Sequence, residues 1–471
     1  MTEAAARPPS SILPLAAGLA VFALTLAASA VLNDGDTWWH VRAGQWMIDH
    51  RAVLHHDLWS YTLPGQPWST HEWLSEVLMA LAFNAAGWAG VMGLIAACAG
   101  SAAFLLARGL SRSMTGLGLA ATAIVALACA GPVLLARPHI IALPLLVLWA
   151  DGLIAARARG EAPPWWMLAV MVLWANLHGG YFFGLALIGP FALEALVAAP
   201  GNLLERIKAV KGWIVFGVAA LLAALITPHG VEGLLFPFKL LSLTALSGVQ
   251  EWRAADFTRL EPLEIAILAA VAVCLGRGVK VPPVRLGVLL LLLHMALQHT
   301  RHQLLLGVVG SMILAQPLAQ AMGQTVVQSA KPRRWLAPAA VVLAAALLIV
   351  RLTVPVTRGD GPVAPVAALA SVPDAVRATP VLNEYGMGGY LIWQGVKPFV
   401  DGRTDFYGDD FMARYYAATA PDKAALDALL ARWKVRWTIL SPGNPLAAMM
   451  DQRPGWRRSY ADRFAVVHIL E

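Results

Sequence analysis

Long runs of apolar residues dominate the first three quarters of this chain. A helix needs about 20 apolar residues to cross a hydrocarbon core about 30 Å thick. We expect about eleven such spans, near residues 12–32, 88–107, 116–134, 138–156, 164–178, 180–199, 211–227, 262–277, 284–298, 303–321 and 335–353. Charged residues make up only 13% of the chain, against about 25% in an ordinary soluble domain. The sequence therefore predicts an α-helical polytopic membrane protein and excludes a soluble enzyme, a disordered chain and a nucleic-acid binder.

Two of these apolar segments need separate interpretation. The first run, 12–32, is longer than the hydrophobic part of a secretory signal and lacks a clean cleavage site, so we expect it to remain as a span. The segment from Trp73 to Gly87 is apolar but short. Counting it as a full span would invert every later helix, so we expect a partial or interfacial helix there.

Charge separates the chain into two parts. Residues 360–471 contain 12 acidic and 12 basic residues, so the net charge of +7 belongs wholly to the part before them. This balance is typical of a globular domain outside the bilayer. We expect a membrane domain over 1–355, with a first outer loop over 32–72, and a small α/β domain over 360–471.

Positive charge in short loops predicts the orientation of the spans. One set of loops contains most of the basic residues, namely Arg7, Arg108, Arg112, Arg157, Arg159, Arg206, Lys208, Lys211, Arg277, Lys280, Arg285, Lys331, Arg333 and Arg334. These loops should be cytoplasmic, which leaves the N-terminus inside and the C-terminal domain outside. The chain has no organelle-type presequence, which favours a bacterial cytoplasmic membrane and a periplasmic domain.

Polar motifs gather in the loops of the opposite, outer set. In chain order they are Asn33–His40, Ser69–Trp73, Arg137–His139, Asn176–Tyr181, Thr227–Gly230, Gln250–Arg253 and Gln298–His302. Most of the 12 histidines lie in or beside these motifs or in the first outer loop, and the inner loops contain none. A one-sided collection of His, Asp, Glu, Arg and Trp predicts a polar cavity that opens outward.

The acidic pair Asp34 and Asp36 follows the first span directly, separated by Gly35. Two carboxylates at this spacing can turn toward one site from a loop, where they suit a catalytic general base. The pair could also hold a divalent metal bound to a phosphate. The alternative is structural, because either aspartate could cap a helix over Trp38 to Asp49. We expect Asp36 and Asp34 to be catalytic, and the Trp-rich segment Trp38–His50 to be a helix in the outer interface.

Other polar residues at the outer ends of the spans are candidates for binding an anionic substrate: Arg301, His299, His302, Arg137, His71, Glu72, His40 and His178. A guanidinium fork matches the geometry and charge of a phosphate. The structural alternative for each arginine is snorkelling at the interface, and for His178 a tight turn at Gly179-Gly180. The histidine spacing does not predict a dedicated zinc site.

Together these motifs resemble the GT-C superfamily of membrane glycosyltransferases, which includes protein O-mannosyltransferases and aminoarabinose transferases. Asp34-Gly35-Asp36 stands where that superfamily has its acidic motif, Trp38–His50 stands for its juxtamembrane helix, and Thr70-His71-Glu72-Trp73 for its polar helix entry. The architectural match covers about residues 10–355, and the residue-level match about 30–80. His71-Glu72-Trp73 departs from the better-known members because it lacks their proline.

The resemblance implies transfer of a sugar from a polyprenyl-phosphate donor to a glycan, lipid or protein acceptor outside the cytoplasmic membrane. It implies that Asp36 takes the acceptor proton while arginine and histidine groups stabilise the departing lipid phosphate. Two other functions stay open from the residues: a lipid or glycan transporter or flippase, and a non-catalytic scaffold of envelope polysaccharide assembly. A transporter would favour internal repeats and charges near mid-membrane, and the sequence has neither.

The tail reads as alternating short strands and helices. We expect strands at 381–383, 397–400, 435–440 and 464–470, and helices at 409–417 and 421–433. Gly386–Tyr390 lacks the residues of a phosphate-binding loop, so it predicts a turn or close helix–strand packing. Asp401–Asp405 ends a strand with clustered charges, which suit either acceptor recognition or a solvated turn.

Overall fold

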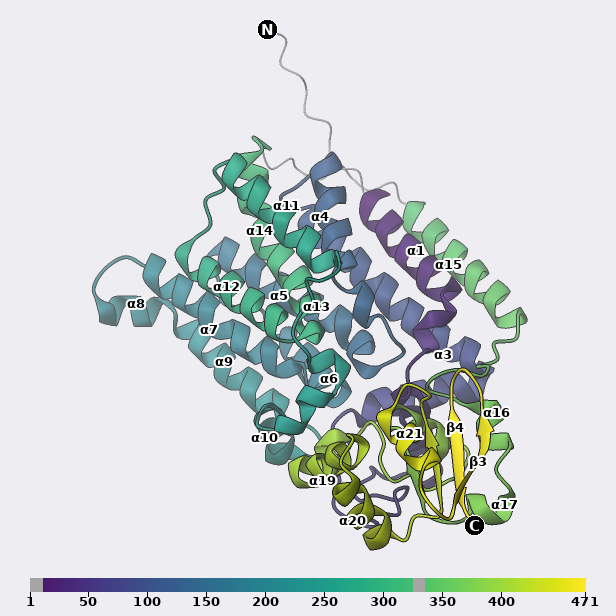
Figure 1. The fold of residues 1–471 in the computed structure, drawn as a ribbon. Coiled ribbons are helices and arrows are strands. Elements are labelled where there is room, and N and C mark those ends of the chain that lie inside the picture. Colours follow the sequence, from purple (N-terminus) through teal and green to yellow (C-terminus); the bar gives the residue numbers. More distant parts are fainter. Residues whose placement is uncertain (1–11, 325–334) are drawn as a thin grey trace.

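The computed structural model describes residues 12–324 and 335–471. Arg7, Lys331, Arg333 and Arg334 of the predicted cytoplasmic set lie outside the described residues. The helices pack side by side, and the strands gather at one end of them (Figure 1). Up to residue 353 the α-helices are α1 (Ile12–Ala27), α2 (Asp36–His50), α3 (Trp73–Leu110), α4 (Gly116–Ala128), α5 (Pro138–Arg159), α6 (Met167–Leu177), α7 (Tyr181–Ala198), α8 (Leu203–Ala209), α9 (Lys211–Ala224), α10 (Gly230–Leu241), α11 (Pro262–Gly276), α12 (Pro283–Gln298), α13 (Gln303–Leu305), α14 (Ser311–Ala321) and α15 (Leu336–Thr353).

Within the described residues, five helical segments are long and apolar enough to cross a membrane, or six if α8 and α9, which meet at 54°, form one span. The five are α3, α5, α7, Thr300–Ala321 and α15. The apolar helices α1, α4, α6, α11 and α12 have between 10 and 17 residues each, which is below the usual length of a span. The chain is a polytopic helical protein as predicted, and the count of about eleven spans is not confirmed.

Helix α3 is broken where the sequence predicts a partial helix to end. Ala86 and Gly87 have non-helical backbone angles, and Gly87 has a φ of 57°. This left-handed conformation is readily adopted by glycine because it has no β-carbon. The predicted short helix 73–87 and the predicted span 88–107 are therefore the two arms of one kinked helix.

Two proline and glycine signals define the long helix α5. Pro138 occupies its first turn, where a missing N–H costs no helical hydrogen bond. Gly160 ends it in a left-handed conformation, with Arg157 and Arg159 in the last turn near the negative end of the helix dipole. The helix therefore runs between the polar Arg137–His139 motif and a basic loop.

Four strands in the described part of the chain form one sheet of order β1-β2-β4-β3. The strands are β1 (Val381–Asn383), β2 (Trp437–Leu440), β3 (Trp456–Ala461) and β4 (Val466–Leu470). β1 pairs with β2 in parallel, and the other pairs are antiparallel. The helices of this region are α16 (Val366–Ala370), α17 (Asp374–Arg377), α18 (Gly388–Trp393), α19 (Thr404–Thr419), α20 (Lys423–Trp433) and α21 (Pro445–Asp451).

The predicted strand at 397–400 is wrong. The side chain of Asn383, at the end of β1, bonds this segment instead of a neighbouring strand: its Oδ1 accepts from the Phe399 N–H at 2.8 Å, and its Nδ2 donates to the Val400 carbonyl at 2.8 Å. The apolar pattern reflects burial of Phe399 and Val400 in the core of the sheet region. The sequence also missed β3, an edge strand rich in arginine, and placed the start of α19 too late.

Helix α2 forms over the predicted Trp-rich segment, although two of its three tryptophans are buried. Trp38 and Trp39 are 3% and 6% exposed. Trp38 packs against Trp88, Tyr390 and Trp393. Helix α2 therefore lies between α3 and α18. The ring of Trp38 packs against residues of these two helices instead of facing lipid.

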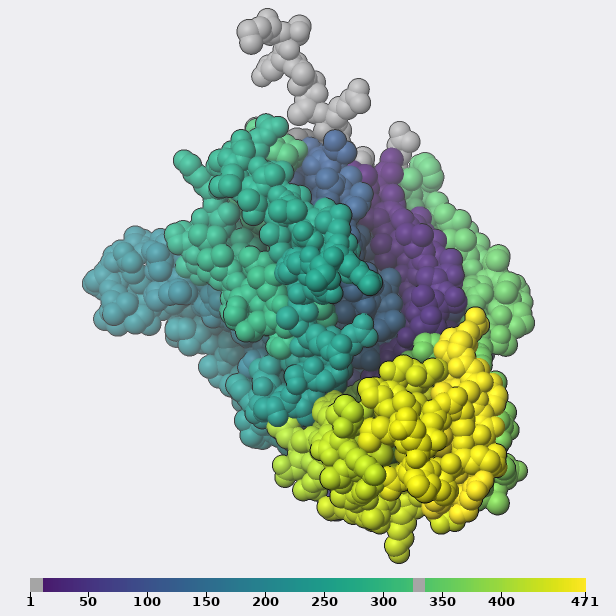
Figure 2. Space-filling model, in the orientation of Figure 1, coloured from purple at the N-terminus to yellow at the C-terminus, as the bar shows by residue number. Residues whose placement is uncertain are grey.

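The C-terminal region sits on the end of the helices where the first outer loop lies (Figures 1 and 2). Two side chains of that loop bond it: Tyr61 donates to the Val381 carbonyl at 2.8 Å, and Thr62 to the Phe399 carbonyl at 2.9 Å. On the other side, Asp409 accepts from the N–H of Ala245 in η3 (Thr244–Gly248) at 2.8 Å. The C-terminal region is thus held between the segment that carries Tyr61 and Thr62 and the segment that carries Ala245.

Candidate active site

The acidic motif lies between the short turn η1 (Ser29–Leu32) and helix α2, against the segment that leads to Arg137. The Ala136 N–H donates to the Val31 carbonyl at 2.8 Å, and the Thr37 hydroxyl donates to the Ala136 carbonyl at 3.1 Å. These bonds hold two segments that are far apart in sequence side by side. They place the side chain of Arg137 directly against the carboxylates of the motif.

Arg137 binds three carboxylates at once. Its Nε and Nη2 donate to the two oxygens of Asp34, and Nη2 also lies 2.8 Å from Asp36 Oδ2. Its Nη1 donates to Glu251 Oε2 at 2.7 Å. The predicted phosphate contact of Arg137 remains a prediction, because in this structure the guanidinium faces carboxylates on every side.

The two aspartates differ in their environment. Asp34 is buried, which alone would raise its pKa, but the charge and hydrogen bonds of Arg137 hold that pKa below its usual range. For Asp36 burial prevails: it raises the pKa to about 7, and the nearby charge of Asp34 adds to the rise against the lowering by Arg137. Asp34 is therefore the ionised anchor of Arg137, and Asp36 is a carboxyl poised to take up a proton near neutral pH.

The capping alternative is not supported for Asp36. It is the first residue of α2, and the residue before the helix, Gly35, makes no side-chain cap. Asp34 Oδ1 does accept the Asp36 N–H at 3.0 Å, which stabilises the turn into the helix. The carboxylate of Asp36 instead accepts from Trp39 Nε1 at 3.1 Å and remains partly exposed.

Glu251 connects the acidic pair to a second arginine. It lies in η4 (Gln250–Trp252), and its Oε1 is 3.2 Å from Arg301 Nη1. The Arg301 guanidinium lies over the ring of Trp252, 4.5 Å from its centroid. Arg137 and Arg301 thus face each other across one carboxylate, and the charges of both hold the pKa of Glu251 below its usual range despite its burial.

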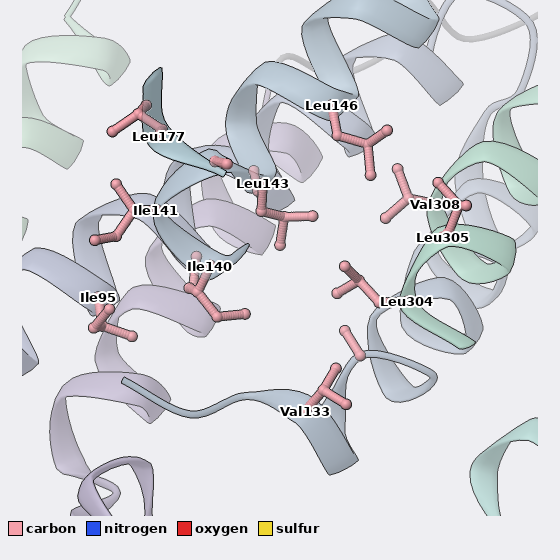
Figure 3. Close-up of a cluster of buried hydrophobic side chains, with 14 of the residues drawn as sticks. Ile95, Val133, Ile140, Ile141, Leu143, Leu146, Leu177, Leu304, Leu305 and Val308 are labelled. Carbon is pink, nitrogen blue, oxygen red and sulfur yellow. The ribbon is translucent and has the colours of Figure 1, made fainter. Parts of the chain in front are cut away.

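A cavity of about 80 Å³ begins at Glu251 and Arg301. Its polar end also includes His139, His178 and His302. Its other walls are apolar, and Figure 3 shows several of these side chains within a cluster of buried hydrophobic residues. These apolar residues include Val133, Leu143, Leu146, Leu304 and Leu305. The lining is mostly apolar with a few charged groups at one end, a composition that small-molecule sites share, while the volume is below the roughly 300–1,000 Å³ of such sites.

Glu72 joins the polar end of this region through His178, whose Nε2 lies 3.3 Å from Glu72 Oε1. His71 Nε2 lies 3.7 Å from the same oxygen, and its ring stacks on Phe236 at 3.9 Å. Burial raises the pKa of Glu72 to about 8. These residues therefore provide a second protonatable carboxyl beside the cavity.

Two predicted site residues point elsewhere. His40 is buried between α2 and α3, where its Nδ1 lies 3.2 Å from Glu76 Oε1. His299 Nδ1 lies 2.6 Å from the Trp252 carbonyl, so this ring fixes the backbone beneath Arg301. Neither residue is among those that line the cavity. Of the predicted His299/His302 pair, His302 faces the cavity.

The C-terminal region supplies a wall of the site. A β-carbon at Gly402 would lie 1.7 Å from Asp36 Oδ1, and one at Gly389 would lie 2.1 Å from the Gly35 carbonyl. The Tyr385 hydroxyl donates to the Gly402 carbonyl at 3.0 Å. The predicted glycine turn at 386–390 is thus a place of close backbone approach, and its partner is the acidic motif.

A buried ion-pair cluster fixes this wall. Arg403 Nε and Nη2 donate to the two oxygens of Asp401, each at 2.7 Å, and Nη1 lies 2.8 Å from Asp57 Oδ1 in the first outer loop. All three side chains are buried. The solvated turn predicted as an alternative for Asp401–Asp405 is therefore wrong, because the cluster ties the C-terminal region to the loop that carries Asp36.

Asp34 and Asp36 are the residues predicted to hold a divalent metal, if one binds. In the described residues no group of three or more His, Cys, Asp or Glu side chains is arranged to hold a metal ion. Arg137 already provides the positive charge that a divalent cation would supply to these carboxylates. Two carboxylates already paired with a guanidinium are a poor donor set for a metal ion.

Four residues of the site were not among the predicted site residues. They are Glu251, His139, Tyr385 and Gly402. The sequence signal for the first two was present, because both lie in the outer polar motifs. For Gly402 the signal was indirect, because the sequence pointed only to the charged segment Asp401–Asp405 around it.

No family model matches the sequence, and no characterised protein matches it at the sequence level. Among solved structures the chain resembles the apo oligosaccharyltransferase of Archaeoglobus fulgidus, with a TM-score of 0.53 and 10% identity over 91% of this chain and 69% of that one. The chain has a GT-C-like fold. ArnT from Cupriavidus metallidurans, solved with undecaprenyl phosphate, matches over 97% of both chains with a TM-score of 0.47 and 13% identity. The GT-C-like fold predicted from the motifs is confirmed.

Proposed function

We propose that this protein transfers a sugar from a polyprenyl-phosphate-linked donor to an acceptor hydroxyl on the outer side of a bacterial cytoplasmic membrane. In this proposal residues 1–355 are the membrane domain, with the N-terminus in the cytoplasm. The catalytic loop is 32–72, and 360–471 form a periplasmic domain. The likeness in fold to an oligosaccharyltransferase supports glycosyl transfer as the class of reaction.

One observation carries the proposal. The carboxyl of Asp36, with a pKa raised to about 7 by burial, is connected through Arg137 and Glu251 to Arg301 at the mouth of an apolar cavity. A general base works best when its pKa is close to the working pH. A cation at the mouth of an apolar chamber suits a phosphate that carries a hydrocarbon chain. This network supports the proposal because it connects a candidate base to a candidate phosphate site.

In this proposal Arg301 and His302 bind the phosphate of the donor. Arg301 engages Glu251 through Nη1, and both Arg301 and His302 line the cavity. A lipid phosphate bound there gains negative charge as the sugar leaves, and a fixed guanidinium lowers the energy of that charge. The apolar walls at Leu143, Leu304 and Leu305 would take the first isoprene units.

In this proposal Asp36 is the general base for the acceptor hydroxyl. The acceptor oxygen forms a bond to the anomeric carbon while the bond from that carbon to the phosphate oxygen breaks. The electron pair of the broken bond leaves on the lipid phosphate, and the acceptor proton passes to Asp36. Asp34 keeps Arg137 in place, so the positive charge beside Asp36 is constant through the reaction.

The proposal is tested by incubating the purified protein in lipid vesicles with a panel of labelled polyprenyl-phosphate sugars and a mixed envelope extract as acceptor. We expect label to move from the lipid to the extract fraction, leaving polyprenyl phosphate. A flippase would move the intact donor across the vesicle membrane without cleaving it. A scaffold would do neither, and either of these results would contradict the proposal.

A further inference from the structure

A second cleft lies at the other end of the helices, away from Asp36. Its cavity volume is about 420 Å³, within the range of about 300–1,000 Å³ that small-molecule sites occupy. It is formed by the C-terminal ends of α3 and α5 and by the loop before α6. Its charged lining residues are Arg108, Arg112, Asp151 and Arg159, and its apolar lining includes Leu105 and Leu148.

The cleft runs along α5 from Val147 to Arg159, and the apolar cavity of the candidate active site ends one residue before it, at Leu146. The basic end of the cleft and Arg137 lie at opposite ends of α5. Arg137 precedes the first residue of this 22-residue helix, and Arg159 is its last residue. At 1.5 Å per residue the helix is about 33 Å long, which matches the roughly 30 Å hydrocarbon core of a bilayer. If the active site faces the outer surface, the end of the cleft with Arg108, Arg112 and Arg159 faces the inner one, where the sequence predicts the basic loops.

The charges in the cleft favour an anion. Arg108, Arg112 and Arg159 line it, opposed by Asp151 alone. Arg112 Nη2 is 2.7 Å from Asp151, and Arg159 Nε is 2.7 Å from Glu161 outside the lining. Among the described residues Arg108 has no ion-pair partner. One guanidinium charge is therefore left uncompensated in the cleft.

The surroundings indicate a lipid. Trp165 and Trp166, beside the cleft, are 60% and 53% exposed, and tryptophans in this position are typical of the membrane interface. Leu105 and Leu148 line the same cleft as the guanidinium groups. We propose that the cleft binds the phosphate headgroup of an anionic phospholipid through Arg108 and Arg112, with its acyl chains along Leu105 and Leu148.

The test measures lipid retention by native mass spectrometry of the full-length protein in detergent, titrated with phosphatidylglycerol and, in parallel, with phosphatidylcholine. The Arg108→Ala/Arg112→Ala variant should bind phosphatidylglycerol about 30-fold more weakly, or roughly fivefold for each arginine. A matched control, Arg206→Ala/Lys208→Ala, removes two basic residues of the same predicted face from α8, outside the cleft. This control should bind as the wild type does.

A second variant separates binding from folding. Asp151→Asn keeps the shape of the side chain and removes the opposing negative charge, so it should bind phosphatidylglycerol several-fold more tightly. If the arginines only neutralise the ends of α3 and α5, neither variant changes lipid binding, and the proposal fails. It also fails if phosphatidylcholine binds equally well, or if millimolar inorganic phosphate displaces the lipid, since a free anion would then be the ligand.

Discussion

The α-carbon of Gly402 lies against the carboxylate of Asp36, so close that a β-carbon at position 402 would stand 1.7 Å from Oδ1. These two residues belong to opposite ends of the chain. Their contact means that the C-terminal region forms part of the surface around the proposed base. It also means that the position of Asp36 depends on a residue with no side chain.

Replacing Gly402 with alanine should displace the Asp36 carboxylate and reduce sugar transfer. A displacement of about 1 Å at a reacting group can cost about 100-fold in rate, so we expect a loss of at least tenfold. The measurement is the transfer rate at saturating donor. Gly443→Ala is the matched control, because a β-carbon there meets nothing within 4 Å and its backbone is not left-handed. Equal transfer rates for the two variants would contradict the claim that the contact with Gly402 positions Asp36.

Transfer should depend on pH through Asp36. Burial raises the pKa of this carboxyl to about 7, and the deprotonated form is the base. The rate should therefore be level above pH 7 and fall about tenfold per unit well below it. The measurement is kcat/KM against pH. Glu72→Gln is the control, because the pKa of Glu72 is raised to about 8. If the midpoint near 7 vanished in that variant, it would belong to Glu72 instead.

The buried cluster around Arg403 should dominate the stability of the C-terminal region. Arg403→Met leaves Asp57 and Asp401 buried without their cation. Breaking a buried pair in this way costs about 3–5 kcal/mol. The measurement is thermal unfolding in detergent. Arg457→Ala, which removes an exposed pair with Glu471, should cost about 0–1 kcal/mol. A similar small change for both variants would show that the cluster is not a stabilising link.

Filling the apolar cavity should weaken binding of the lipid-linked donor and leave the function of Asp36 as a base unchanged. Leu304→Trp adds bulk to a wall of the cavity, so KM for the lipid-linked donor should rise, by tenfold or more, with a smaller change in kcat. The measurement is transfer at varied donor concentration. Leu193→Trp is the control, since Leu193 is exposed on α7. An unchanged KM for Leu304→Trp would place the lipid chain elsewhere.

Local sequence signals predicted most of what depends on neighbouring residues. The Trp-rich helix α2, the break at Gly87 and the helix α20 follow from periodicity, glycine and caps that act within a few residues. The strand expected at 397–400 failed because its hydrogen bonds go to the side chain of Asn383. An apolar pattern indicates that a segment is buried. Burial alone does not distinguish a strand from an irregular segment.

The site depends on contacts between distant segments, which the sequence could predict only in part. That Asp34, Asp36 and Arg137 face one side followed from loop charge. Arg137 also binds Asp34, Asp36 and Glu251 together. This arrangement depends on backbone hydrogen bonds between distant segments, such as the bond from Ala136 to Val31, and no local sequence pattern encodes them. The same holds for Gly402, whose partner lies in the first outer loop. Such positions are set by how whole helices and the C-terminal region pack.

The most direct test of the account is the single-turnover rate of sugar transfer by Asp36→Asn beside the wild type. The amide keeps the shape of the side chain and cannot take the acceptor proton. The account predicts normal membrane insertion and donor binding, with a transfer rate lower by about 100-fold to 10,000-fold. Near wild-type transfer by Asp36→Asn, and by Asp34→Asn as well, would contradict it.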